Sequence, residues 1–198
     1  TMKEISNIIY KFIFLFFILI SFQAKGSVLS VGQSDAKVTV KVFSSLTCPH
    51  CANFHTKIFY KLEKDFINEG KVRFEHHAFP LDLAALNAEI VVRCHVDNIA
   101  KIKLLGKMYE KQKIWAVGSD INKINESIKK IGLELNLDDV KMDECLKSEK
   151  AQDNVLNQRI EAQKKYKIDS TPTILINEKK YDGKIDYKQF KKAIEKNL

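Results

Sequence analysis

The feature that most constrains the fold is a strand that passes directly into a helix beginning at two cysteines. Val38 to Phe43 read VTVKVF, a run rich in β-branched residues with no Gly or Pro. Such a run predicts a central strand that is apolar on both faces. The apolar residues that follow recur every three or four positions, which predicts one face of a helix: Cys51, Phe54, Ile58, Leu62 and Phe66.

The ends of this helix are also predicted by the sequence. Thr47 suits the N-cap, Pro49 the first turn and Gly70 the C-terminal stop. Cys48 therefore stands at the mouth of the helix. Cys51 follows one turn later on the apolar stripe.

The rest of the chain predicts an α/β order with a long helical block. A second strand is expected at Val72–Phe79, closed by Pro80. Helical patterns follow at 83–96, 98–112, 119–131, 137–148 and 151–166, with breaks marked by Trp115, Gly118 and Gly132. The chain then predicts a strand at Thr173–Ile176, a turn at Asn177–Lys179, a returning strand at Lys180–Gly183 and an amphipathic helix at 186–198.

This order divides the chain into three parts. Residues 27–80 and 165–198 form a discontinuous α/β domain of thioredoxin type, and residues 81–164 form an all-helical insertion. Residues 1–26 have the features of a secretory signal peptide, since Lys3 and Lys11 accompany an eleven-residue run, Phe12–Phe22, in which only Ser21 is polar. Because a spanning helix needs roughly 20 apolar residues, an uncleaved anchor is the less favoured alternative. We therefore expect export to the periplasm.

The basic character of the chain does not favour nucleic-acid binding. The formal charge is +8, but three of the 33 basic residues are arginine, the better reader of phosphates and bases. The lysines are scattered and usually lie near acidic residues, which is typical of a solvated surface. We expect no nucleic-acid partner.

The cysteine pair allows three interpretations. Two thiols three apart on a helix can form a redox couple, and a thiol at a helix N-terminus is stabilised as thiolate by the backbone dipoles. His50 adds positive charge when protonated, and a favoured thiolate makes the oxidised pair an oxidant of other thiols. Cys48 is then the exposed, attacked sulfur, and Cys51 is the shielded resolving thiol.

A zinc site and an inert pair are the other two interpretations. Zinc needs two more ligands, and the candidates are His55, His76 and His77. His76 and His77 are neighbours on a predicted strand and so point to opposite faces. These histidines and His95 are expected to be surface or packing residues.

A second motif lies far along the chain, at Ser170-Thr171-Pro172-Thr173. The proline is either ordinary punctuation before a strand or a cis proline. If Thr171–Pro172 is cis and next to Cys48, the backbone of Thr171 can pair with an extended substrate chain.

Together these motifs resemble the DsbA family of thioredoxin-fold oxidoreductases, over nearly all of the chain after residue 26. The resemblance rests on FSSLTCPHCANFH, AEIVVRCHVDNIAKIKLLGKMYEKQ, LDDVKMDECLKS and STPTILINEKKYDG. It implies that Cys48 is the nucleophile, Cys51 its resolving partner, His50 (in the motif with Pro49) a tuner of potential, and Thr171–Pro172 the cis substrate-binding site. It also implies re-oxidation by a membrane quinone reductase of DsbB type.

The chain departs from the family in two places and adds a second cysteine pair. Many members carry an acidic residue where this chain has Val42, and several carry Glu where it has His55. We expect oxidising character to survive both losses. Some members have a structural disulfide in the insertion, and by that resemblance we favour one between Cys94 and Cys145 over two free buried thiols.

The sequence therefore predicts a periplasmic thiol:disulfide oxidoreductase that introduces disulfides into reduced or unfolded exported proteins. We expect neither a metal nor a dissociable cofactor, because the cysteine pair itself carries the electrons, and we expect a monomer. The alternatives are a disulfide isomerase or reductase of the same fold and, in a different class, a metal-binding or copper-handling module.

Overall fold

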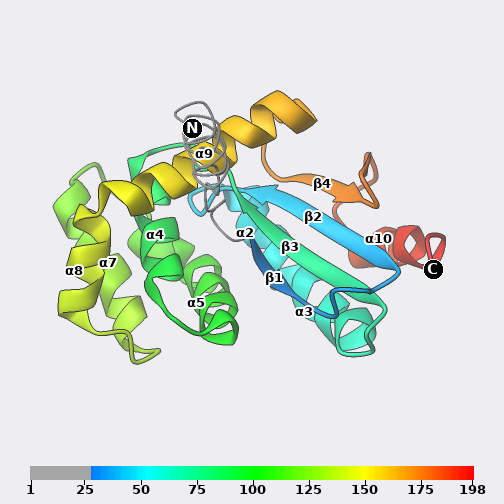
Figure 1. Cartoon of the computed structure of the whole chain (residues 1–198), viewed down its shortest axis with the longest axis horizontal. Coiled ribbons are helices and arrows are strands. Elements are labelled where there is room, and N and C mark those ends of the chain that lie inside the picture. The colour runs from blue at the N-terminus through cyan, green and yellow to red at the C-terminus, as the bar shows by residue number, and fades with distance from the viewer. Residues whose placement is uncertain (1–27) are drawn as a thin grey trace, which may run out of the picture.

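The computed structural model describes residues 28–198, which are arranged around one five-stranded sheet (Figure 1). The predicted signal segment, residues 1–26, lies outside the described residues. The strands lie in the order β1-β3-β2-β4-β5. β2 and β3 run parallel, and the other neighbours are antiparallel. The strands are β1 (Leu29–Val31), β2 (Val38–Ser44), β3 (Val72–Ala78), β4 (Thr173–Ile176) and β5 (Lys179–Lys180).

The crossover between β2 and β3 is the helix that begins at the cysteines. It starts as α2 (Pro49–Phe54), passes through α3 (Tyr60–Leu62), and contains two π-helical turns, His55–Phe59 and Glu63–Ile67. The run is continuous, as the sequence predicts. The wider turns close hydrogen bonds over five residues, as when Asn68 N–H donates to the carbonyl of Glu63 at 2.9 Å. The predicted apolar stripe is buried along its whole length.

The helical insertion forms a separate block beside the sheet (Figure 1). Its helices are α4 (Leu83–Cys94), α5 (Asn98–Glu110), α6 (Gln112–Trp115), α7 (Ile121–Leu133), α8 (Asp139–Lys147) and α9 (Glu149–Tyr166). Each long helix begins with an N-cap residue whose side chain accepts a hydrogen bond from a backbone N–H of the first turn. The capping residues are Asp82, Asp97, Asp120, Asp138 and Ser148, and Asp186 does the same for the final helix α10 (Tyr187–Glu195).

The two faces of the sheet are covered by different helices. Alternate residues of β2 point to opposite sides, so Val40 and Val42 join the large core beneath α2, whereas Phe43 joins a smaller cluster. That smaller cluster contains Ala162 of α9 and Ile168, and α9 crosses this face in the view of Figure 1. Both faces are thus buried, as an apolar central strand requires.

Several local features differ from the sequence predictions. Strand β1 is not predicted, because its three residues are too short to show a period, yet it pairs with β3 and Leu29 is buried. Gly132 does not end a helix. It lies inside α7, where a Cβ would collide with Met142 Sδ, so its role is close packing. The predicted helix at 98–112 is interrupted, and α6 folds back so that Trp115 Nε1 donates to the carbonyl of Met108 at 2.8 Å.

The returning strand of the late hairpin begins at Lys179, one residue earlier than predicted. The turn therefore consists of two residues, Asn177 and Glu178. Asn177 and Glu178 both have positive φ, 46° and 66°, as a two-residue primed turn requires. Asn177 is held there because its Oδ1 accepts from the N–H of Thr39 at 2.8 Å. The turn therefore ties β4 to β2 as well as to β5.

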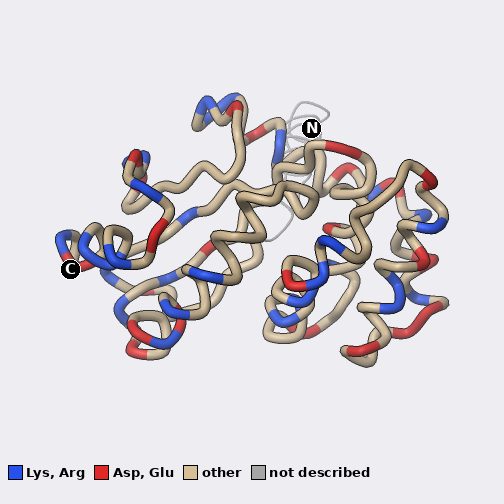
Figure 2. The backbone as a smooth tube through the Cα atoms, turned by 180° about the vertical axis from the view of Figure 1, so that it is seen from behind, with Lys and Arg blue, Asp and Glu red and all other residues tan. Residues whose placement is uncertain are grey.

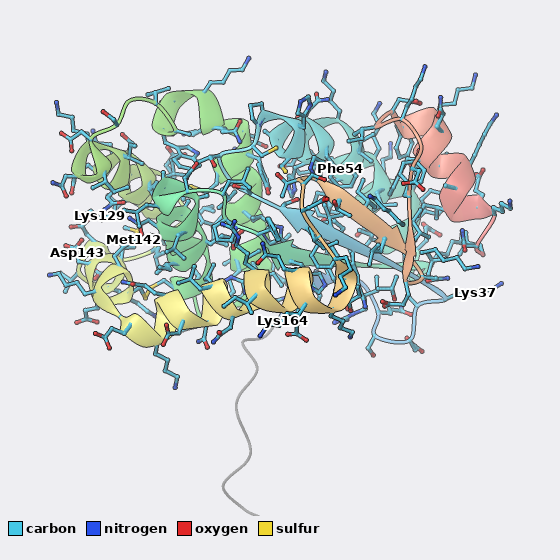
Figure 3. All side chains as sticks on the ribbon, turned by 90° about the horizontal axis from the view of Figure 1, so that it is seen from above. Lys37, Phe54, Lys129, Met142, Asp143 and Lys164 are labelled. Atoms are coloured by element: carbon cyan, nitrogen blue, oxygen red, sulfur yellow. A yellow bond between two sulfur atoms is a disulfide. The ribbon has the colours of Figure 1, made fainter. Side chains whose placement is uncertain are left out.

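The outer surface carries both signs of charge. Figure 2 shows Lys and Arg interleaved with Asp and Glu along most of the chain. At the outer end of the insertion, Lys129 of α7 and Asp143 of α8 lie together (Figure 3), with 2.9 Å between Nζ and Oδ1. Among the described helices, none combines the length and the apolarity that a membrane crossing requires.

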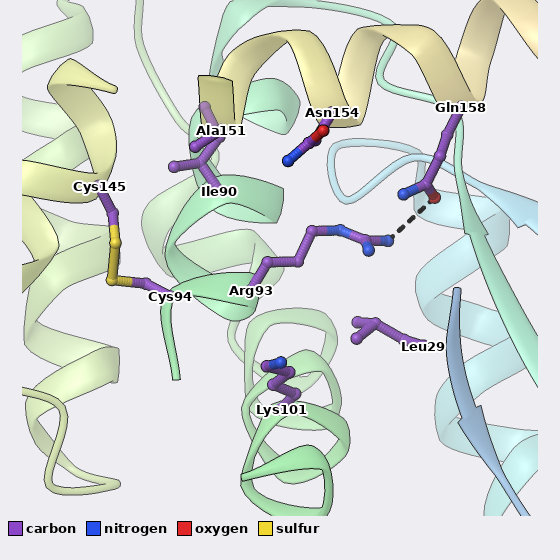
Figure 4. A pocket seen from close by; sticks show the side chains of 9 residues that line it. All are labelled: Leu29, Ile90, Arg93, Cys94, Lys101, Cys145, Ala151, Asn154 and Gln158. Carbon is purple, nitrogen blue, oxygen red and sulfur yellow. Dashed lines mark hydrogen bonds between the residues drawn. A yellow bond between two sulfur atoms is a disulfide. The ribbon is translucent and has the colours of Figure 1, made fainter. Parts of the chain in front are cut away.

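Cys94 and Cys145 are joined by a disulfide that connects the end of α4 to α8 (Figure 4). Their Cα atoms are 6.0 Å apart and 51 residues separate them along the chain. Both helices pack in the same cluster, so the cross-link ties together segments that already meet.

Removing this disulfide is expected to lower stability. In a Cys48→Ala/Cys51→Ala background, reduction or the further change Cys94→Ala/Cys145→Ala should cost up to about 4 kcal/mol, because closing a loop of about 50 residues restricts the unfolded chain. Urea unfolding of the two forms measures the difference. Detection of two free thiols in the oxidised Cys48→Ala/Cys51→Ala protein by mass spectrometry would contradict the cross-link.

Candidate active site

The entrance of helix α2 places Cys48 where a helix has unpaired N–H groups. Cys48 is the N-cap residue, with φ −79° and ψ 119°, and Pro49 takes the first helical position. The prediction of Thr47 as N-cap is wrong, because Pro49 suits the first helical position and so puts the cap at the residue directly before it. Thr47 instead donates from its Oγ1 to Asp82 Oδ2 at 2.7 Å.

Cys48 and Cys51 are both thiols in the structure, and both are largely covered. Cys48 is 7% exposed and Cys51 is 1% exposed. Cys48 is thus the more accessible of the two, but it is less exposed than the sequence predicts. The loop at Thr171 lies against it, with 3.4 Å between Cys48 Sγ and the Thr171 carbonyl oxygen.

This contact joins residues 123 apart in the sequence. It follows from the sheet, since β4 pairs with β2 in a register that sets Thr173 opposite Phe43. The segment before β4 therefore returns to the end of β2, where the cysteine loop begins. The Thr171–Pro172 peptide bond is cis.

The surroundings of the two thiols lower the pKa of Cys48 and raise the pKa of Cys51. The thiol of Cys51 lowers the pKa of Cys48 to about 5 by hydrogen bonding to it, against an opposing effect of burial. The Thr171 side chain and the backbone N–H groups of Cys51 and His50 lower that pKa further. Burial raises the pKa of Cys51 strongly, and the hydrogen bond to Cys48 raises it again. At neutral pH the pair therefore holds one anion, on Cys48.

The remaining residues of the motif border a groove. Pro49 and His50 are exposed and line a hollow of about 560 Å³ between α2 and the α5–α6 region. Tyr109 and Gln112 form part of its other wall.

A buried ionic cluster joins α4 to β3, and sequence reasoning missed it. Glu89 of α4 is 0% exposed and pairs with His76 Nε2 of β3 and with Arg93 Nε, the latter at 3.2 Å. Burial disfavours the Glu89 anion, but its charge interactions and hydrogen bonds with His76 and Arg93 together offset that cost, and the pKa of Glu89 is lowered. The sequence signal that could have revealed this cluster is a Glu on the apolar stripe of the predicted helix at 83–96.

His55 is buried where several DsbA family members carry Glu. Its ring stacks on Phe59 and Tyr109, with centroids 4.4 and 5.0 Å apart. Burial lowers the pKa of His55 to about 3, so it is neutral at physiological pH. Among residues 28–198, no hydrogen-bond partner lies within reach of its buried Nε2.

The three histidines that were candidates for zinc binding have different partners in the structure. His55 packs among aromatic rings, His76 pairs with Glu89, and His77 hydrogen-bonds Glu75 at 3.1 Å on the other face of the sheet. Within residues 28–198 no group of three or more His, Cys, Asp or Glu side chains is placed to hold a metal ion.

Comparison with known proteins agrees with this fold. The thioredoxin family model matches residues 24–196. Disulfide bond formation protein D of Bacillus subtilis is 35% identical over 178 residues, which cover 85% of this chain and 76% of that protein. Relatives from Rickettsia are longer, and the aligned region is 57% of the length of the Rickettsia typhi protein.

Solved structures extend the likeness to the whole described chain. Wolbachia pipientis alpha-DsbA1 has a TM-score of 0.78 at 24% identity, covering 90% of this chain and 93% of that one, and shows the same fold. BdbD of Bacillus subtilis has a TM-score of 0.65 at 25% identity, covering 86% and 92%. A thioredoxin fold that carries an inserted helical subdomain, a paired-cysteine helix entrance and a second disulfide defines the class, and the chain belongs to the DsbA family of disulfide oxidoreductases.

The low pKa of Cys48 is directly testable. In reduced protein, thiolate absorbance should titrate with a midpoint near pH 5, and this transition should be lost in Cys48→Ser. Because folding lowers the pKa of the Cys48 thiol, the Cys48 thiolate stabilises the folded form of the reduced protein. This stabilisation is complete above the unfolded pKa of about 8.5 and is lost as the pH falls through the folded pKa of about 5. A midpoint above pH 8 would contradict the arrangement.

The buried cluster makes a separate prediction. Glu89→Gln should destabilise the protein by about 3 kcal/mol at pH 7, because His76 and Arg93 lose their buried anion. Since the folded pKa of Glu89 is lowered, its contribution is present above about pH 4.3 and falls as the carboxyl protonates below it. Urea unfolding between pH 3 and 7 measures this. Glu126→Gln removes one of the exposed partners of Lys129 and serves as control; equal losses in both variants would refute the prediction.

Proposed function

We propose that the protein oxidises the thiols of reduced, exported proteins in the periplasm, by donating a disulfide held between Cys48 and Cys51. The observation that carries the proposal is the placement of Cys48 Sγ at the entrance of α2, next to the Thr171 carbonyl and with a lowered pKa. The periplasmic location is supported by the signal-like features of residues 1–26.

The chemistry proceeds in two exchanges. A substrate thiolate attacks Cys48 Sγ of the oxidised pair, forming a mixed disulfide, and the Cys48–Cys51 bond breaks with its electron pair passing to Cys51 Sγ. Cys51 then takes up a proton, since its pKa is strongly raised. A second substrate thiolate attacks the substrate sulfur of the mixed disulfide, and Cys48 departs as a thiolate. The substrate has lost two electrons and the cysteine pair has gained them.

The direction of this transfer follows from the leaving group. A thiol with a low pKa leaves more readily, and a stabilised Cys48 thiolate favours the reduced form of the pair. The protein is therefore an oxidant toward ordinary thiols. No dissociable cofactor takes part in this scheme, because the cysteine pair carries the electrons, and His50 next to Cys48 would tune the potential.

We expect the surface around Cys48 to bind both the substrate chain and the partner that re-oxidises the cysteine pair. The contact between Thr171 and Cys48 supports the expectation that the backbone of Thr171 pairs with an extended substrate chain whose cysteine is being oxidised. The groove lined by Pro49 and His50 offers a further contact area. A membrane quinone reductase of DsbB type would regenerate the disulfide through the same sulfur, and the protein would act as a monomer.

Oxidation of reduced ribonuclease tests the proposal. The oxidised protein should restore disulfides stoichiometrically, and Cys48→Ser should be inactive. Reduced Cys51→Ala should be trapped as a mixed disulfide when its Cys48 thiolate attacks a disulfide of scrambled ribonuclease, because no resolving thiol is present. If scrambled ribonuclease is repaired faster than reduced ribonuclease is oxidised, the protein is an isomerase instead. Stoichiometric metal in anaerobically purified protein without any thiol exchange would favour a metal-handling role.

A further inference from the structure

The loop between β2 and α2 is held by two side chains of the helical insertion. On one side, Thr47 Oγ1 donates to Asp82 Oδ2 at 2.7 Å. On the other, Gln112 Nε2 donates to the carbonyl of Leu46 at 2.7 Å and to that of Cys48 at 3.0 Å. The segment that carries the reactive sulfur is thus fixed from outside the thioredoxin fold.

Gln112 is itself rigidly placed. It opens the short helix α6, is 7% exposed, and lies 64 residues from Cys48 in the chain. Helix α6 is held by Trp115, which is 1% exposed and bonds back to the carbonyl of Met108. Both N–H bonds of the Gln112 amide point at loop carbonyls, so the amide has one useful orientation.

These two hydrogen bonds act on oxygens close to the redox sulfur. The carbonyl of Cys48 also accepts from the N–H groups of Cys51 and Ala52, each at 3.1 Å, and so forms part of the first turn of α2. A carbonyl oxygen is the negative end of a peptide dipole, and the Gln112 donors offset that negative charge next to the thiolate. Without the Gln112 donors, the carbonyls of Leu46 and Cys48 would each lose a hydrogen-bond partner. The loop would then change its conformation to restore the lost hydrogen bonds.

We propose that Gln112 is a positioning residue for the disulfide exchange, which holds the Leu46 and Cys48 carbonyls so that the Cys48 thiolate stays at the helix entrance. The helical insertion then sets the reactivity of a sulfur that belongs to the thioredoxin fold. This inference rests on the proposed role of Cys48 as the reacting thiol.

The experiment compares Gln112→Met with wild type. Met has a similar length but no donor, so the pKa of Cys48 should rise by about half a unit or more. The equilibrium with glutathione should shift about threefold toward the oxidised pair, because a shift of half a unit corresponds to that factor. Gln112→Glu keeps the shape but points an anion at the carbonyls, and should raise the pKa of Cys48 further.

Gln152→Met is the matched control. Gln152 Nε2 donates to the carbonyl of Leu146 at 3.1 Å, so this variant removes a comparable bond within the insertion at its α8–α9 junction. It should lose stability in urea but leave the Cys48 titration unchanged. If Gln112→Met folds poorly, Gln112→Asn retains the donor but cannot reach both carbonyls, and should show the same upward shift.

The outcomes separate the two proposals. A high Cys48 pKa in the wild type defeats the proposed function itself. A low wild-type value that Gln112→Met and Gln112→Asn leave unmoved, with stability lowered as in Gln152→Met, overturns the role of Gln112 and leaves the proposed function intact.

Discussion

The rest of this structure depends on the interaction between one sulfur and the first turn of a helix. Pro49 occupies the first helical position, so Cys48 becomes the N-cap residue, although its thiol makes no capping hydrogen bond of the kind that Asp82 makes for α4. A thiol at a helix N-terminus is stabilised as an anion. Cys51, one turn deeper and almost fully buried, remains protonated. The hydrogen bond from Cys51 is the main cause of the lowered pKa of Cys48, and burial is the main cause of the raised pKa of Cys51.

The thioredoxin fold supplies the geometry of this site, and the insertion supplies much of its support. β2 delivers the loop and β4 returns Thr171 to it, through pairings within the sheet. Asp82 and Gln112, which hold the loop from both sides, come from the helices. The insertion therefore does more than cover the sheet, because its packing determines where the loop carbonyls can lie.

The buried charge of this chain lies at a different place from that in many DsbA family members. Val42 is buried where those members have an acid, and His55 is neutral among aromatic rings. The carboxylate buried here is Glu89, which belongs to α4 and is balanced by His76 and Arg93. The lowered pKa of Cys48 has a different origin, in hydrogen bonds from Cys51 and Thr171 and from nearby backbone N–H groups.

The sequence by itself determined the local structure, because local signals are enough for it: the strand Val38–Ser44, the helix that begins at the cysteines, the Asp-capped helices and the strand Thr173–Ile176. It also indicated Cys48 and Cys51 as the candidate redox pair, because two cysteines three apart at a helix entrance favour that use. Contacts between distant segments were decided only by the tertiary structure. The short strand β1, the pairing of His76 with Glu89, and the two bonds from Gln112 to the loop depend on packing across 13 to 66 residues, and no periodicity records them. The covering of Cys48 by Thr171 belongs to the same group, because it requires the register of β4 against β2.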